Sequence, residues 1–408
     1  MAFCRACGGA LTELLGLGAM PLANALVAPG TPTEAQPRFP LSLMRCETCC
    51  LVQLREIVDP AHLFRQYNYL SSTSPAFVAH AKQLAEQLIA ERLLEGSSHV
   101  IEIASNDGYL LQHYRAAGVP ALGIEPAANI ADVARARGIP TRNEFFSREL
   151  GKVLAQEGLA ADVLHANNVL AHVPDLRGIV GGIASVLKPG GIAVIEAPYL
   201  RDLIDKLEFD TIYHEHQCYF ALTPLVRLFK SEDLSIVDVE RIAIHGGSLR
   251  IFARRGTEAA PSARVTALLA QETAWGVHTP ELYRRFGEQV RAFRPKLGEF
   301  LDGLRAQGKS IAAYGAAAKG ATLLNYCGIG RETIDFAVDR SPMKQGMALP
   351  GVEIPVFAPD ELTRRRPDYL LLLAWNFAAE IIHQQQDYAR SGGRFIVPVP
   401  IPKVIENA

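Results

Sequence analysis

Two cysteine pairs near the N-terminus have the spacing of a metal site. Cys4 and Cys7 form one C-x-x-C pair, and Cys46 and Cys49 form another. Each pair can wrap one side of an ion, so four thiolates would complete a tetrahedron around a structural zinc. Cys50 directly follows Cys49, and we choose Cys49 as the fourth ligand because it keeps the two-residue spacing. Unrelated buried cysteines, or a single redox pair, are the alternatives.

A second motif, at residues 213–216, combines side chains that acid–base catalysis uses. Tyr213, Glu215 and His216 supply a phenol, a carboxylate and an imidazole within four residues. Histidine is the usual base near neutral pH. A polar surface loop is the first alternative. A second metal site is another, because His214 and His216 would share one side of a strand, although no H-E-x-x-H motif accompanies them.

An acidic turn marks a nucleotide site. Glu102, Ser105, Asn106, Asp107 and Gly108 occupy the turn between an expected strand and helix. In a doubly wound sheet, ligands dock at such turns. The turn lacks the G-x-G-x-x-G of dinucleotide sites. Its two carboxylates would repel a pyrophosphate and tolerate a cationic sulfonium, so its polarity favours S-adenosylmethionine.

Three further positions extend this site. Glu125 ends the next expected strand, where a carboxylate can accept both ribose hydroxyls. Phe145, beside Phe146, could flank the adenine, and Asn167 and Asn168 end another strand beside the methionine part. Each residue alone could equally be a solvated carboxylate or a core aromatic, so the ordered series carries the prediction.

The elements that must position these residues alternate between helix and strand, which predicts parallel α/β sheets. A central sheet is expected from strands at 99–104, 121–125, 161–166 and 192–196, with a helix at 77–94 before it and a turn at 188–191. A helical connector at 258–306 leads to a second sheet with strands at 310–314, 333–338, 368–374 and 394–397, and a helix at 319–326. The expected fold is α/β in three domains: 1–70 (zinc-binding and substrate lid), 71–256 (Rossmann-like, binding S-adenosylmethionine) and 257–408 (connector and a second Rossmann-like domain binding the substrate).

Charged and polar residues also follow the strands of the C-terminal sheet. Small residues at 315–318 allow a ligand to approach the backbone, and the helix that follows would attract anions at its start. We expect the following residues to hold a nucleotide diphosphate, with solvated charges as the alternative: Lys319, Asp339, Lys344, Trp375 and Asn376. The segment 246–248, Gly-Gly-Ser, is either a close approach to the substrate or a turn.

Composition narrows the partners. The formal net charge of −2 gives no basic excess for nucleic acid. No basic segment leads into an apolar run near the N-terminus, and the apolar stretch 369–375 is too short to span a bilayer. We therefore expect a cytoplasmic protein without a membrane partner.

With these motifs in view, the whole chain resembles the sugar C-methyltransferases. These enzymes act on nucleotide-linked 4-keto-deoxysugars in the making of branched sugars for antibiotics and surface glycans. The resemblance rests on the cysteine pairs, on Asn167-Asn168 with His172, and on the segments 67–72, 102–108, 213–216, 314–320 and 338–340. It implies three domains, a structural zinc, bound S-adenosylmethionine, a dTDP-linked 4-keto-deoxysugar as substrate, and a monomer.

The resemblance also implies roles. His216 would remove the C3 proton of the sugar to give an enolate, Tyr213 would donate to a sugar oxygen, and Glu215 would orient or balance the site. Tyr67 and His172 would flank the sugar, and base and donor could be exchanged among these residues. Tyr69 and Ser71 would contact the substrate.

Three other functions stay open. A binding or scaffold protein could keep a vestigial methyltransferase fold, and an O- or N-methyltransferase of small molecules would use the same cofactor fold. A nicotinamide oxidoreductase would need the glycine fingerprint that the turn lacks.

Overall fold

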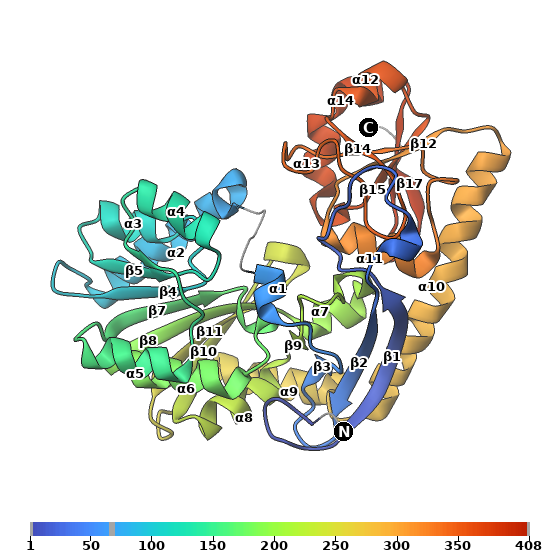
Figure 1. Cartoon of the computed structure of the whole chain (residues 1–408). Helices are drawn as coiled ribbons and strands as arrows, with labels where there is room; N and C mark the ends of the chain where they lie inside the picture. The colour runs from blue at the N-terminus through green and yellow to red at the C-terminus, as the bar shows by residue number, and fades with distance from the viewer. Residues whose placement is uncertain (1–2, 65–69, 406–408) are drawn as a thin grey trace.

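The computed structural model describes residues 3–64 and 70–405, and the chain is organised around three sheets (Figure 1). The N-terminal sheet is antiparallel and has the order β1-β2-β3-β9. Its strands are β1 (Leu11–Met20), β2 (Phe39–Cys46), β3 (Val52–Leu54) and β9 (Cys218–Tyr219). The long hairpin of β1 and β2 was not foreseen in the short apolar pieces of this region. Strand β9 comes from the middle of the chain, so the N-terminal sheet reaches into the central domain.

The central sheet has seven strands in the order β10-β11-β8-β7-β4-β5-β6. The strands are β4 (Val100–Ile103), β5 (Ala121–Ile124), β6 (Thr141–Arg142), β7 (Ala161–Asn167), β8 (Leu187–Pro198), β10 (Leu234–Ile242) and β11 (Ser248–Arg255). Strands β8 to β6 run parallel, and β11 and β10 are antiparallel additions at one edge. Every residue of β4 and β5 is buried, as expected when helices cover both faces of a parallel sheet. The turn expected at 188–191 instead belongs to β8, whose pairing with β7 is irregular there.

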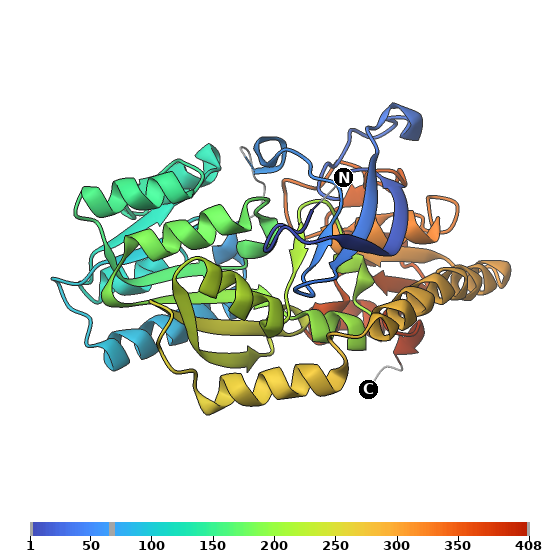
Figure 2. The same cartoon turned by 90° about the horizontal axis from the view of Figure 1, so that it is seen from below.

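Helices cover both faces of this sheet (Figure 2). They are α2 (Pro75–Arg92), α3 (Leu111–Ala116), α4 (Ala128–Ala136), α5 (Arg148–Gln156), α6 (Leu176–Val186), α7 (Leu200–Asp205) and α8 (Leu222–Ser231). The carboxyl ends of the parallel strands therefore share one edge, where the turns after β4, β5 and β7 meet. A short helix, α1 (Pro60–Phe64), lies beside this edge in Figure 1.

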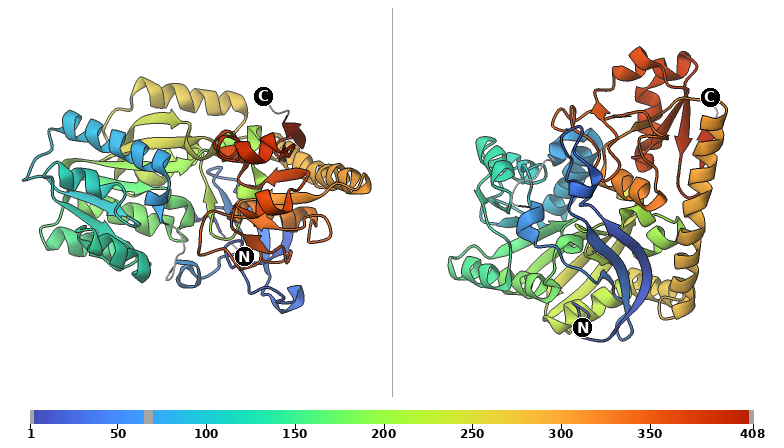
Figure 3. Two further views of the ribbon diagram at one scale, coloured as in Figure 1. Left: turned by 90° about the horizontal axis from the view of Figure 1, so that it is seen from above. Right: turned by 45° about the vertical axis from the view of Figure 1, so that its right-hand side comes forward.

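Two connector helices link the central and C-terminal sheets. Helix α9 (Ala263–Trp275) ends at Gly276, which adopts the left-handed conformation. Helix α10 (Pro280–Ala306) then runs beside the N-terminal strands and the C-terminal domain (Figure 3). The helical connector predicted at 258–306 is therefore present as two helices.

The C-terminal sheet has the order β14-β13-β12-β15-β16-β17 and is parallel except for β17. Its strands are β12 (Ile311–Tyr314), β13 (Ala337–Val338), β14 (Val356–Phe357), β15 (Tyr369–Leu372), β16 (Arg394–Val397) and β17 (Lys403–Ile405), and its helices are α11 (Ala318–Cys327), α12 (Glu361–Arg365), α13 (Ala378–Gln384) and α14 (Gln386–Arg390). The strand expected at 333–338 shortens to β13, because Thr333 closes a turn by donating its backbone N–H to Gly330.

The three parts are tied together by direct bonds. Val27 of the N-terminal part bridges Ala348, and Gln36 accepts a hydrogen bond from the backbone N–H of Gly351 at 2.7 Å. Within the described residues, no helix has both the length and the apolar character that crossing a membrane requires.

Candidate active site

The four predicted thiols come together in one cluster. The sulfur atoms of Cys4, Cys7, Cys46 and Cys49 all lie within 4.8 Å of one another. The Cys4–Cys49 and Cys7–Cys46 sulfur pairs are each 3.5 Å apart. Tetrahedral zinc with bonds of about 2.3 Å would hold sulfur atoms about 3.7 Å apart, so this donor set fits zinc. The thiol of Cys50 lies outside the cluster.

Cys50 has partners of its own. Its sulfur accepts from Nη2 of Arg45 at 3.3 Å and lies 3.4 Å from Nδ1 of His278. Gly8, with a φ of +72°, forms the turn after the first pair. Gly9 lets the second pair approach closely, since a Cβ there would lie 2.6 Å from Oγ1 of Thr48 and 3.2 Å from the sulfur of Cys46.

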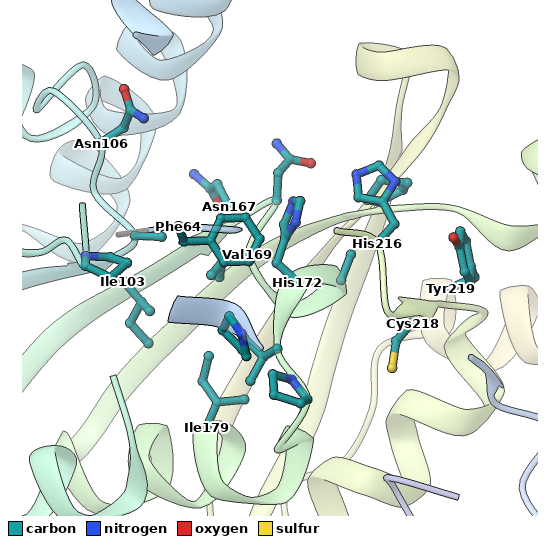
Figure 4. Close-up of a pocket in the computed structure, with 18 of the residues that line it drawn as sticks. Phe64, Ile103, Asn106, Asn167, Val169, His172, Ile179, His216, Cys218 and Tyr219 are labelled. Carbon is teal, nitrogen blue, oxygen red and sulfur yellow. The ribbon is translucent and has the colours of Figure 1, made fainter. Parts of the chain in front are cut away.

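A cavity of about 720 Å³ lies at the carboxyl edge of the central sheet (Figure 4). All three parts of the chain line it, because α1 closes one side and the start of α11 closes another. The predicted residues that line it are Ser71, Asn106, Glu125, Phe145, Asn167, Asn168, His172, Tyr213, His216 and Lys319. The predicted residues that do not line it are Glu102, Ser105, Asp107, Gly108, Glu215, Asp339, Lys344, Trp375 and Asn376. Tyr67 and Tyr69 lie outside the described residues.

Glu125 is held rigidly at one end of the cavity. Its Oε1 accepts from the backbone N–H of Ala127 at 2.8 Å, and its Oε2 accepts from that of Asn106 at 2.9 Å. Burial raises the pKa of Glu125, and the two backbone donors oppose that shift. The backbone therefore fixes the orientation of this carboxylate at the end of β5.

The two acidic residues of the predicted acidic turn, Glu102 and Asp107, do not present an unpaired negative charge to the cavity. Burial raises the pKa of Glu102 well above its usual value, and Tyr109 bonds to it. The carboxylate of Asp107 pairs with Arg137 at 2.9 Å and also accepts from Ser72. Glu102 and Asp107 therefore support the preference for a cationic cofactor less than their sequence positions suggested. At the predicted cofactor end of the cavity, the acidic group in the lining is Glu125.

Ser105 and Gly108 shape the turn from behind. The side chain of Ser105 points at Gly123 of β5, where a Cβ would lie 2.3 Å from the serine oxygen. Gly108 has a φ of +81°, and a Cβ there would lie 2.7 Å from Ile139. Both contacts require glycine, so they set the path of the turn that carries Asn106.

Two asparagines offer polar groups beside Glu125. Asn167 ends β7, and Asn168 follows it in the left-handed conformation with a φ of 56°. Oδ1 of Asn167 and both side-chain polar atoms of Asn168 are buried without a protein partner among the described residues. Buried amides normally find partners, so these groups suit a polar ligand in the cavity.

A cluster of rings forms the opposite end (Figure 4). The rings of His172 and His216 lie 4.9 Å apart, and those of Tyr213 and His216 lie 4.1 Å apart. Nδ1 of His216 lies 2.8 Å from the carbonyl oxygen of Thr211, and Nε2 lies 2.9 Å from the hydroxyl of Tyr213. A carbonyl only accepts, so Nδ1 carries the proton and Nε2 offers its lone pair. The fold thus directs Nε2 of His216 toward the hydroxyl of Tyr213.

The other two acid–base residues of this end behave differently. Burial lowers the pKa of His172 to about 4, so this imidazole is neutral at physiological pH. Burial raises the pKa of Glu215 to about 7, and its Oε1 accepts from Nδ2 of Asn24 at 2.7 Å. Glu215 therefore joins the motif to the N-terminal part of the chain rather than facing the cavity.

Three family models match consecutive stretches of the chain. A zinc binding domain matches residues 4–64, a methyltransferase domain matches 77–239, and a C-methyltransferase C-terminal domain matches 243–400. C-methyltransferase NovU of Streptomyces niveus is 37% identical over 406 residues, covering 98% of this chain and 96% of that protein. This chain belongs to the C-methyltransferase family.

Two further similarities cover half of this chain or less. Ubiquinone biosynthesis O-methyltransferase of Burkholderia pseudomallei (strain 1710b) is 26% identical over 36% of this chain and 68% of its own length. The structure of the CcbJ methyltransferase from Streptomyces caelestis covers 49% of this chain and 100% of its own, at 14% identity and a TM-score of 0.38.

The family membership settles the class of the reaction and of the cofactors. The chain is a C-methyltransferase that uses S-adenosylmethionine, and its N-terminal domain binds zinc. The resemblance seen in the motifs and the α/β class with a zinc-binding N-terminal domain are thereby confirmed.

This methyltransferase also has cavity residues that the motifs did not indicate. The hydroxyl of Tyr219 is buried without a partner among the described residues, and its ring lies 6.5 Å from that of His216. Glu208 lines the same cavity, and its buried Oε1 has no partner in the part of the chain that the structure describes. Tyr219 lies in a short strand and Glu208 before a single turn, so neither position had a pattern by which to find it.

The residues predicted around the C-terminal strands divide into two groups. Nζ of Lys319 donates to Oδ1 of Asn376 at 2.9 Å and lies 4.7 Å from the ring centre of Trp375. Asp339 instead accepts from the backbone N–H of Ala316 at 2.7 Å, and Lys344 donates to the carbonyl of the same residue at 2.9 Å. Asp339 and Lys344 thus hold the turn after β12, and Lys319 alone of the predicted group lines the cavity.

Proposed function

We propose that this methyltransferase transfers a methyl group to C3 of a nucleotide-linked 4-keto-deoxysugar through an enolate. The observation that carries the proposal is the fixed Nε2 of His216 in the same cavity as Glu125. A ring carbon becomes nucleophilic only after losing a proton, and the neighbouring keto group makes that proton acidic. The site therefore needs a base and a donor for the resulting oxyanion.

His216 is the base of this proposal. Thr211 holds Nδ1–H, so Nε2 can take the C3 proton either directly or through the hydroxyl of Tyr213. The electron pair of the broken C–H bond passes to the C3–C4 bond, and the negative charge develops on the C4 oxygen. His172 stays neutral and packs against His216, so it places no positive charge beside the base that would make His216 less basic.

Tyr219 supports the proposal as a donor to the C4 oxygen. Its hydroxyl is buried, and burial raises its pKa well above 10, so the phenol keeps its proton. A buried neutral donor that is already in place stabilises a developing oxyanion strongly. Tyr213 is already bonded to the base, which leaves Tyr219 the better placed of the two phenols.

The other end of the cavity fits the methyl donor. Glu125 would accept the ribose hydroxyls, Asn167 and Asn168 would hold the methionine part, and Phe145 would cover the adenine. Bound S-adenosylmethionine supplies an electrophilic methyl group. C3 of the enolate would take this methyl group as the methyl–sulfur bond breaks, which leaves S-adenosylhomocysteine and restores the C4 keto group. The proton would stay on His216 until solvent accepts it.

The test is a panel of nucleotide-linked 4-keto-deoxysugars incubated with S-adenosylmethionine, with product mass as the readout. In D₂O without the methyl donor, the parent should exchange the C3 hydrogen for deuterium, and His216→Gln should lose both exchange and turnover by about 10²-fold or more. His214→Gln is the matched control, because Nε2 of His214 lies 3.1 Å from the carbonyl of Pro40 and outside the cavity lining. Exchange that persists in His216→Gln, or methylation of an oxygen or nitrogen in every acceptor, would overturn the proposal.

A further inference from the structure

Glu208 is a buried carboxylate that the proposed chemistry does not use. It precedes the single-turn helix η4 (Phe209–Thr211), lines the cavity and is only 5% exposed. Its Oε1 has no hydrogen-bond partner among the described residues. Buried carboxylate oxygens normally accept at least one hydrogen bond, so this oxygen lacks a donor that a ligand in the cavity could provide.

The Gly-Gly segment of the sequence makes room for this carboxylate. Gly246 has a φ of +94°, and a Cβ there would lie 2.8 Å from both carboxylate oxygens of Glu208. The carbonyl of the same glycine accepts from Lys206. The close approach that residues 246–248 suggested is therefore an approach of backbone to Glu208, which holds the carboxylate in place.

Lys319 brings a positive charge from the C-terminal domain to the same region. Helix α11, which carries Lys319, packs against η4, and Nζ of Lys319 is held by Asn376. Burial raises the pKa of Glu208 to about 7, and the charges of Lys206 and Lys319 counteract that shift. Burial also raises the pKa of Asp210 to about 6, and Lys319 counteracts that shift too. Trp375 closes the group by donating to Oδ2 of Asp210 at 2.6 Å.

We infer that Glu208 and Lys319 form a subsite for a ring hydroxyl of the sugar, and this inference rests on the proposed function. Oε1 of Glu208 would accept from the hydroxyl, and Nζ of Lys319 would donate to a sugar oxygen beside it. The neighbouring carboxylates of Glu208 and Asp210 would repel a diphosphate. The ammonium of Lys319 would repel an amino substituent of the sugar. A hydroxyl both donates and accepts, so it suits a carboxylate beside an ammonium.

The subsite is coupled to the base through one turn of backbone. The N–H and the hydroxyl of Thr211 donate to the carbonyl of Glu208 at 3.1 and 2.7 Å. The carbonyl of Thr211 then accepts from Nδ1 of His216 at 2.8 Å. A hydroxyl held by Glu208 would therefore fix the sugar ring relative to the nitrogen that removes its proton, which makes Glu208 a residue that selects the substrate.

The experiment compares two nucleotide-linked 4-keto sugars that differ by one ring hydroxyl. Glu208→Met removes the acceptor at similar size, and Glu208→Gln keeps a neutral one. On the hydroxylated sugar, kcat/KM should fall by about 10- to 100-fold in the Met variant and by less in the Gln variant. On the deoxy sugar, both variants should stay within about threefold of the parent.

Asp202→Asn is the matched control, because both oxygens of Asp202 already bond to Arg241 at 3.0 Å and the residue is outside the cavity lining. S-adenosylmethionine affinity, measured by calorimetry, should be unchanged in all three variants. An equal loss on both sugars would overturn the inference, because Glu208 would then act through the base. No loss on either sugar, or a larger loss on an amino-substituted analogue, would overturn it as well. A parent that binds S-adenosylmethionine and methylates no keto sugar would instead defeat the proposed function, and the inference with it.

Discussion

Loss of zinc should disable the base while sparing the cofactor site. The connection runs through the backbone beside His216. Arg5, between the first two thiols, donates to the carbonyl of Gln217 at 3.1 Å. Strand β3 begins three residues after Cys49 and pairs with β9, with Val52 opposite Tyr219. The zinc site is thus directly bonded to the segment that holds His216 and Tyr219.

The size of the effect follows from these bonds. A structural zinc contributes about 10–16 kcal/mol to a small domain, comparable with the about 5–15 kcal/mol that keeps a whole domain folded. The bonds from Arg5 and β3 contribute only about 1 kcal/mol each, so they cannot hold the sheet without the metal. A displacement of about 1 Å at a catalytic group can cost about 10²-fold in rate. We therefore expect kcat to fall by that factor or more.

Cys7→Ser tests this expectation, because Cys7 is the half-buried member of the cluster and its loss disturbs packing least. Zinc content would be measured by elemental analysis, kcat with an acceptor that the parent uses, and cofactor affinity by calorimetry. Cys327→Ser is the control, since Cys327 lies at the end of α11 outside the cluster. A zinc-free Cys7→Ser protein with kcat within about threefold of the parent would refute the reasoning, and so would a parallel loss of cofactor affinity.

Three further predictions concern single side chains. Glu125→Gln should weaken S-adenosylmethionine binding by about 10-fold or more, measured by calorimetry, because the ribose loses a charged acceptor; unchanged affinity would remove Glu125 from the site. Tyr219→Phe should lower kcat by about 10- to 100-fold with cofactor affinity retained, because it removes one oxyanion donor; an unaltered kcat would exclude that role. Burial raises the pKa of Glu215 to about 7, so the folded protein binds a proton that the unfolded chain releases from about pH 4.5 upward. The contribution of Glu215 to the free energy of unfolding therefore falls as pH rises through that window. Between about pH 5 and pH 8, the Tm of Glu215→Gln should rise relative to the Tm of the parent. A pH-independent difference in Tm would contradict the shifted pKa.

Local patterns predicted the parallel strands well, and for a physical reason. Strands such as β4 and β5 are buried on both faces and therefore appear as continuous apolar runs between turn residues. The C-x-x-C pairs were similarly visible, because a tetrahedral thiolate site imposes its own spacing. The antiparallel edge of the central sheet was not predicted, since β10 mixes buried and half-buried positions along its length. Strand β11 is buried over its first six residues, but Arg250 interrupts its apolar run.

The site was harder to predict wherever a residue's role depends on distant partners. Asp107 is predicted from its position to be part of the cofactor pocket, but in the structure its carboxylate forms an ion pair with Arg137, 30 residues away. Asp339 and Lys344 looked like diphosphate ligands, yet both bind the backbone of Ala316. Sequence spacing indicates which side chains share an edge of a sheet, but the pairing of charges across that edge is decided by packing.

The need for the whole chain follows from how the cavity is closed. The central domain alone carries the residues proposed to hold the cofactor, because Glu125 and the two asparagines all lie at the ends of its parallel strands. It could not hold the proposed base in register, since the segment of His216 and Tyr219 is paired to β3 of the zinc domain. Nor could it supply Lys319, the lysine that lines the cavity near Glu208, because Lys319 belongs to the C-terminal domain. Methylation at carbon requires proton removal and methyl transfer within one enclosed space, and three domains meet here to form it.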